Sequence, residues 1–145
     1  MRPSLDPYEL LAALDDQGAL SESVVALGAF MLEVCSTIAA SLSSVVFEAL
    51  QVARRSGVQQ ATSADLEAAR VECWKAIEGE PPASAHVCAT RAVICALYPA
   101  SQDPFLELQN FLDFALGAGV TRATLCDVLS KHFLVSGPRG GASGS

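Results

Sequence analysis

The chain has 145 residues, of which 51% are hydrophobic and only 17% are charged, and its formal net charge is −7. The nine basic residues are scattered, so no basic stripe could displace counterions from phosphates, and nucleic acid is not expected as a partner. A mean hydropathy of +0.36 is high for a chain of one domain's length in water, and it predicts apolar surface that a partner covers.

The five cysteines indicate the redox compartment. Their number is odd and no C-x-x-C spacing occurs, so the sequence predicts neither a disulfide framework nor a zinc knuckle. The N-terminal segment carries acidic residues where a signal peptide has a basic start and an apolar run. We therefore expect an intracellular protein, cytoplasmic or nuclear, in a reducing compartment.

The first predicted element is a short helix over residues 4–16. Ser4 or Asp6 can accept a hydrogen bond from its first turn, and Pro7 fits there because first-turn amides have no helical acceptor. Gly18 is expected to end this helix, since glycine readily adopts the left-handed conformation that follows a helix.

A long apolar stretch follows. Between Val24 and Ala53 the only charged residues are Glu33 and Glu48, and apolar residues recur at helical steps of three and four. The pattern predicts one helix over about residues 23–56, in which the apolar part alone would span roughly 45 Å. A membrane span is not expected, because the uncharged segment has only fourteen residues and a span needs about twenty. Contact with a membrane surface stays open.

Four shorter helices are predicted after the long one. Thr62 is the expected N-cap of the first, with Asp65 three residues on, as in a capping box. The other three are expected to open at Ser84, Asp103 and Thr124.

These elements define the expected architecture. No strand-like alternation occurs, so we predict an all-α fold, a bundle of about six helices around the long apolar helix at 23–56. Residues 1–135 form a single domain, and the Gly/Ser-rich residues 136–145 form a flexible tail. The segment Gly57-Val58-x-x-Ala61-Thr62-x-x-Asp65 recurs as Gly119-Val120-x-x-Ala123-Thr124-x-x-Asp127. Either the same capping signals are used twice, or 4–79 and 83–135 are duplicated sub-units.

Residues 7–77 resemble the histone fold of transcription-initiation and centromere subunits. The resemblance rests on a short helix before a long one, and on Ala53-Arg54-Arg55-Ser56-Gly57 leading into Thr62-Ser63-Ala64-Asp65-Leu66. It implies that Thr62 and Asp65 hold the second loop. It also implies a dimer in which the long helix packs on its counterpart through Met31, Cys35, Ile38, Leu42 and Val46.

A long apolar helix wrapped by shorter ones also resembles, in shape alone, the Bcl-2-like bundle of death regulators. That resemblance implies a bundle acting at a membrane surface. The family's Asn-Trp-Gly-Arg signature is absent, since the single tryptophan stands in Cys73-Trp74-Lys75.

No catalytic or metal-binding signature emerges from the sequence. A zinc site would have to combine His86, Cys88, Cys95, Cys126 and His132, but neither of the usual C-x₂₋₄-C and H-x₃₋₅-H spacings occurs. A Cys126–His132 nucleophile pair is not favoured either, because a separation of six residues places the two side chains on different helix faces. We therefore expect no metal, no cofactor and no enzymatic activity.

The aromatic residues are expected in the core, Trp74 among them. One stripe could instead meet a helix of a partner, and it consists of Phe105, Leu108, Phe111 and Leu112. The sequence thus favours a non-enzymatic protein–protein interaction or dimerisation module, a subunit or regulator within a larger complex. The alternative is a Bcl-2-like or lipid-contacting helical bundle at a membrane surface.

Overall fold

The computed structural model describes residues 6–22, 24–57, 60–98 and 103–134, and the predicted all-α class is confirmed within these ranges. The predicted tail at 136–145 lies outside them. The described residues form eight α-helices: α1 (Pro7–Asp16), α2 (Ala19–Glu22), α3 (Val24–Thr37), α4 (Ser44–Gly57), α5 (Ser63–Ala76), α6 (Ala85–Ala96), α7 (Pro104–Gly117) and α8 (Arg122–Leu129). A 3₁₀ turn, η1 (Ala39–Ser41), and a π-helical turn, η2 (Ser130–Leu134), complete them.

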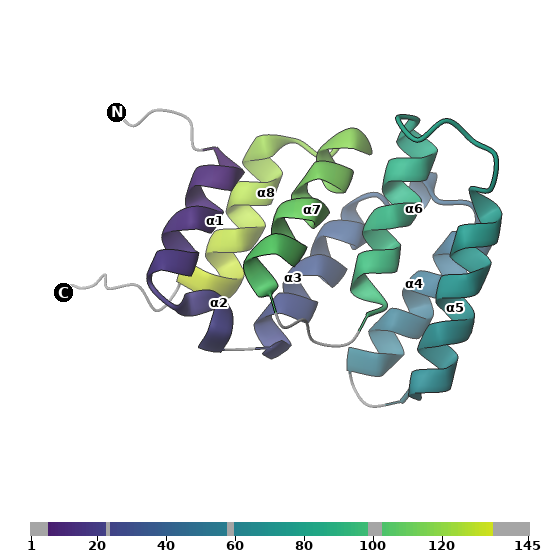
Figure 1. Cartoon of the computed structure of the whole chain (residues 1–145), viewed down its shortest axis with the longest axis horizontal. Helices are drawn as coiled ribbons and strands as arrows, with labels where there is room; N and C mark the ends of the chain where they lie inside the picture. Colours follow the sequence, from purple (N-terminus) through teal and green to yellow (C-terminus); the bar gives the residue numbers. More distant parts are fainter. Residues whose placement is uncertain (1–5, 23, 58–59, 99–102, 135–145) are drawn as a thin grey trace.

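The helices lie in two layers (Figure 1). One layer contains α1, α7, α6 and α5, and the other contains α8, α3 and α4. Helix α3 contacts α6, α7 and α8, so it occupies the middle of the bundle, while α4 and α5 pack on each other at one end. The first helix packs against α7 and α8, which places the early and late parts of the chain side by side.

Three phenylalanines from distant parts of the chain meet in the core. The ring of Phe30 in α3 stands edge-on to Phe111 of α7, with centroids 5.5 Å apart, and to Phe133 of η2, at 6.4 Å. All three side chains are buried. Such edge-to-face pairs contribute about 0.5–1.5 kcal/mol beyond the area that they bury. This cluster therefore joins α3 to α7 and to η2.

The prediction of a single long helix over 23–56 is wrong, because α3 ends at Thr37 and α4 starts only at Ser44. Hydroxyl groups account for the break. Ser36 and Thr37 donate to carbonyl oxygens one turn back, at 2.8 and 2.6 Å, and such back-bonding weakens and bends a helix. Ser43 then accepts a 3.4 Å hydrogen bond from the amide of Val46, and thereby caps α4. Between the two helices, the backbone amides of Ile38, Ser41 and Leu42 donate to carbonyl oxygens three residues back, in place of the α-helical pattern.

Most of the predicted helix starts are confirmed. Asp6, Ser84 and Asp103 are the N-caps of α1, α6 and α7. Thr62 and Asp65 form a reciprocal capping box at α5, with hydrogen bonds of 2.9 and 3.1 Å.

The predicted start at Thr124 is wrong. The N-cap of α8 is Thr121, whose hydroxyl accepts a 3.1 Å hydrogen bond from the amide of Thr124. The helix therefore begins one turn earlier than expected. The two similar sequence segments consequently differ in structure, since Thr62 caps its helix whereas Thr124 lies inside the first turn.

Helices α6 and α7 approach closely where Cys88 faces Gly117. A Cβ added to Gly117 would lie 2.4 Å from the Cys88 Sγ and 3.0 Å from its Cβ. Gly28, within α3, is different, because an added Cβ there would meet nothing within 4 Å. The two glycines therefore form a matched pair for testing the packing of α6 on α7.

Replacing Gly117 with alanine is expected to lower the free energy of unfolding by about 1–3 kcal/mol, because the new methyl group overpacks the contact with Cys88. Gly28→Ala is expected to raise it by about 0.5–1 kcal/mol, since alanine stabilises a helix interior relative to glycine. Urea denaturation of both variants measures the difference. Equal effects of the two substitutions would contradict the close approach of α6 and α7.

Candidate interaction groove between α4 and α5

The structure places most of the predicted interface residues inside the chain's own core. Six of them are buried: Met31, Cys35, Val46, Leu108, Phe111 and Leu112. The other three are partly buried against the same core: Ile38, Leu42 and Phe105. Their packing within one chain leaves little of their surface for contact with a partner.

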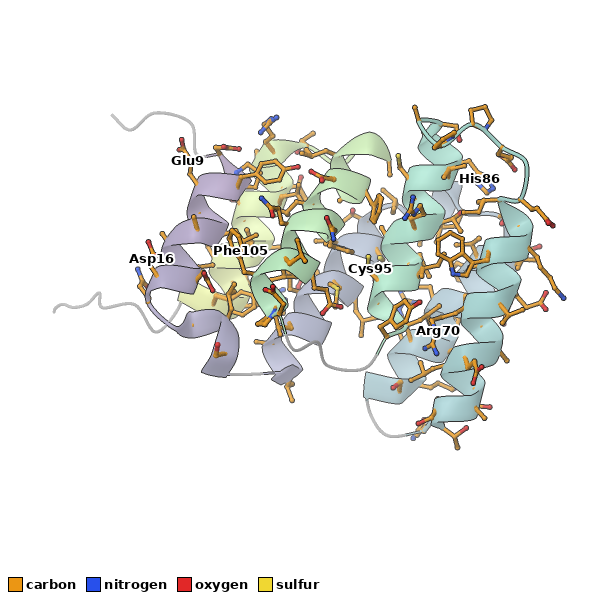
Figure 2. All side chains as sticks on the ribbon, in the orientation of Figure 1. Glu9, Asp16, Arg70, His86, Cys95 and Phe105 are labelled. Carbon is orange, nitrogen blue, oxygen red and sulfur yellow. The ribbon has the colours of Figure 1, made fainter. Side chains whose placement is uncertain are left out.

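The histidines that were considered as metal ligands or catalytic groups lie on separate elements. His86 is at the start of α6, 3.7 Å from Glu80, whereas His132 is in η2, 2.8 Å from Glu33. Figure 2 shows His86 near one end of the bundle and Cys95 in its middle. Within the described ranges, no three histidine, cysteine or acidic side chains come close enough together to hold a metal ion.

The five cysteines are free thiols, and burial favours the protonated form of four of them. Burial raises the pKa of Cys73 to about 11 and that of Cys95 to about 12, and it also raises the pKa of Cys35. Burial raises the pKa of Cys126 as well, and the carboxylate of Asp6 adds to the effect. Since the thiolate is the nucleophile, these environments oppose covalent catalysis at neutral pH.

Among the described residues, a groove lies between α4 and α5. Its volume is about 420 Å³, within the range of known binding pockets. All nine residues that line it come from these two helices. The apolar part of the lining consists of Val45, Ala49, Val52, Ala68 and Ala69.

Short side chains keep the groove open. The two helices are separated by only five residues of sequence, so they run antiparallel as a hairpin, here called the α4–α5 hairpin (Figure 1). Where they meet along the groove, Ala49, Ala68 and Ala69 are too small to fill the space between the backbones. Leu50 and Cys73 are fully buried and point into the bundle instead.

Charged residues surround the apolar floor. Glu48 and Arg55 come from α4, and Asp65 and Glu72 come from α5. Hydrogen bonds from the Thr62 amide and hydroxyl lower the pKa of Asp65, and the nearby Arg55 contributes to this shift. The groove thus combines an apolar floor with a rim of three carboxylates and one guanidinium.

Guanidinium groups attach the α4–α5 hairpin to the rest of the bundle. Arg91 of α6 lies over the rings of both Trp74 and Phe114, at 5.4 and 4.5 Å from their centroids. Arg70 of α5 donates a 2.9 Å hydrogen bond to the carbonyl oxygen of Leu97 at the end of α6. These contacts also correct the expectation that Trp74 is a core residue, since it is 44% exposed and covers Arg91.

This groove was not predicted from the sequence. A signal was present, because Val45, Ala49 and Val52 form a second apolar stripe on α4, beside the core stripe of Val46 and Leu50. A helix with two apolar stripes needs two packing partners. We did not separate the two stripes of α4, because we expected one long helix that is apolar around much of its surface.

Comparison of the chain with protein-family models, with curated proteins and with solved structures gave no match. Among the described residues, no helix combines the length and the apolar character needed to cross a membrane.

Glu33 of α3 holds the C-terminal turn η2. Its carboxylate lies 2.8 Å from His132 Nε2 and 3.1 Å from Lys131 Nζ. Hydrogen bonds from His132 and then Lys131 lower the pKa of Glu33 below its ordinary value of 4.5. The carboxylate therefore stabilises the fold fully above that ordinary value, and the contribution is lost as the pH falls through the lowered pKa.

Glu33→Gln is expected to lower the free energy of unfolding by about 0.5–1 kcal/mol at neutral pH, because these partly exposed pairs are screened by solvent. The difference in the free energy of unfolding between the variant and the unmodified chain should disappear as the pH is lowered below 4.5. Urea denaturation over a pH series measures it, with Glu67→Gln on the exposed part of α5 as the control. A difference that stays constant at acidic pH would exclude an ionised Glu33 as its cause.

Proposed function

We propose that this chain is a non-enzymatic protein–protein interaction module that binds a helical segment of a partner protein in the groove between α4 and α5. The observation that carries the proposal is the apolar floor, which is lined by the α4–α5 hairpin alone and is open to solvent at Val45 and Ala68. The chain would act as a subunit or regulator within a larger complex.

The shape of the groove suits a helix. Two antiparallel helices leave a furrow into which the side chains of a third helix can pack, at an interaxial distance of about 8–10 Å. Alanines at 49, 68 and 69 permit a close approach, while Val45 and Val52 supply larger apolar contacts on one side. The apolar stripe of an amphipathic helix would supply the missing packing partner.

Accessibility favours the groove over the interface residues expected from the sequence. Val45 is 42% exposed and Ala68 is also exposed, so a partner can reach them without any rearrangement. Leu108 and Phe111 are fully buried, and they would meet a partner only if the bundle opened. Covering the groove would also remove part of the apolar surface that the composition predicts to be shielded.

A displayed library of amphipathic helical peptides, each about 14 residues or four turns long, provides the test. Peptides selected on the unmodified chain are expected to bind Ala68→Arg at least about tenfold more weakly, a loss of ~1.4 kcal/mol. Ala68 is exposed, so the arginine can be accommodated without disturbing the core, but its side chain would occupy the groove. Fluorescence anisotropy measures the affinities.

Ala64→Arg is the matched control, because Ala64 is exposed on the same helix but does not line the groove. It should retain the affinity of the unmodified chain. Peptides that bind all three chains equally would show that the binding surface lies elsewhere. Circular dichroism would confirm that each variant is folded.

A further inference from the structure

We propose that the helix bound in the α4–α5 groove is cationic, with lysine or arginine residues beside its apolar stripe. This inference rests on the proposed function, and it adds the chemical class of the partner. Three of the four charged rim residues are acidic, namely Glu48, Asp65 and Glu72, against the single base Arg55. A helix with basic flanks would complement this rim while its apolar stripe covers the floor.

The rim is polarised along the groove. Arg55 and Asp65 lie beside the connection between the two helices, where their opposite charges offset each other. Glu48 and Glu72 are each seven residues away along their helices, which is two turns or roughly 10 Å. The end of the groove away from the connection is therefore the more acidic one, and the basic residues of the partner should gather there.

Lys75 offsets this acidic end only weakly. Its ammonium lies 3.6 Å from the Glu72 carboxylate, but the two side chains are 66% and 57% exposed. An ion pair with this much exposure contributes little to the stability of the fold. The ammonium or guanidinium group of a partner can therefore replace the Lys75 ammonium beside Glu72 with little loss of free energy. Glu72 is thus available to a cationic partner.

The charge of the whole chain acts in the same direction. A formal net charge of −7 attracts a basic segment over a distance of about a Debye length, roughly 8–10 Å at physiological salt. The same charge repels anionic membrane surfaces and acidic proteins. Association with a basic partner should therefore be fast, and it should weaken as salt is added.

A second copy of this chain is a poorer occupant of the groove. In an antiparallel pairing of two hairpins, Arg55 of one copy would approach the Glu48 and Glu72 end of the other. Asp65 would accompany it, so the joint rim would keep the same excess of three carboxylates for every guanidinium. Two chains of charge −7 would also repel each other.

Three synthetic peptides with one common apolar stripe, flanked by lysine, glutamine or glutamate, provide the test. The lysine peptide is expected to bind about tenfold more tightly than the glutamine peptide at low salt, and the glutamate peptide should bind most weakly. Raising the salt to about 0.5 M should bring the three affinities together, because these rim charges are exposed to solvent. Fluorescence anisotropy measures each affinity.

Charge reversal distinguishes the effect of the rim charges on peptide affinity from the effect of the net charge of the chain. The double variant Glu48→Lys/Glu72→Lys is expected to invert the order, so that the glutamate peptide binds most tightly. The control Glu9→Lys/Glu67→Lys changes the net charge equally, at exposed positions outside the groove. Glu9 lies on α1, at the opposite end of the bundle (Figure 2). This control should preserve the order.

The other outcomes overturn one proposal or the other. Equal affinities for the three peptides, all lost in Ala68→Arg, would exclude the cationic partner and leave the helix-binding groove in place. Peptides that bind without any dependence on Ala68 would overturn the proposed function itself. Light scattering that finds a dimer of the unmodified chain and a monomer of Ala68→Arg would identify a second copy as the occupant and exclude the cationic helix.

Discussion

The interruption between α3 and α4 determines how the bundle is built. Hydroxyls of Ser36 and Thr37 bond to carbonyl oxygens of the preceding turn, and Ser43 caps the helix that follows. Because the chain changes direction there, one continuous apolar sequence supplies two differently placed helices. Helix α3 enters the centre, next to α6, α7 and α8, whereas α4 pairs with α5 at the end of the bundle. Without the break, α4 could not lie in the hairpin that forms the groove.

Local signals made part of this fold predictable. The caps at Asp6, Thr62, Ser84 and Asp103 depend on one side chain and the amides of the next turn, so short sequence patterns identify them. The break at 38–43 was harder to predict, because an apolar stripe at helical spacing continues through it and the competing hydroxyl bonds are individually weak. The start of α8 was misplaced because Thr121 and Thr124 are equally good cap residues in the sequence, and the structure has Thr121 as the cap.

The groove depends on contacts that no local pattern encodes. Val45, Ala49 and Val52 look like core residues in the sequence, but with α5 beside α4 they line the groove, where Ala49 is buried and Val45 is 42% exposed. Trp74 shows the same kind of error, since a large aromatic residue was expected inside and instead covers Arg91 at the surface. In both cases the decisive factor is which neighbouring helix reaches the residue. Hydrophobicity alone does not determine that.

The packing of α1 on α7 and α8 has a consequence for synthesis on the ribosome. Leu11 and Leu14 are fully buried, but the helix α7, against which α1 packs, begins roughly 90 residues later in the chain. At about 5–20 residues per second, the first helix waits for roughly 5–20 s before this partner has been made. During that interval its apolar face is exposed to other nascent chains and to chaperones. The α4–α5 hairpin does not wait in this way, because its two helices are neighbours in sequence and α5 is made directly after α4.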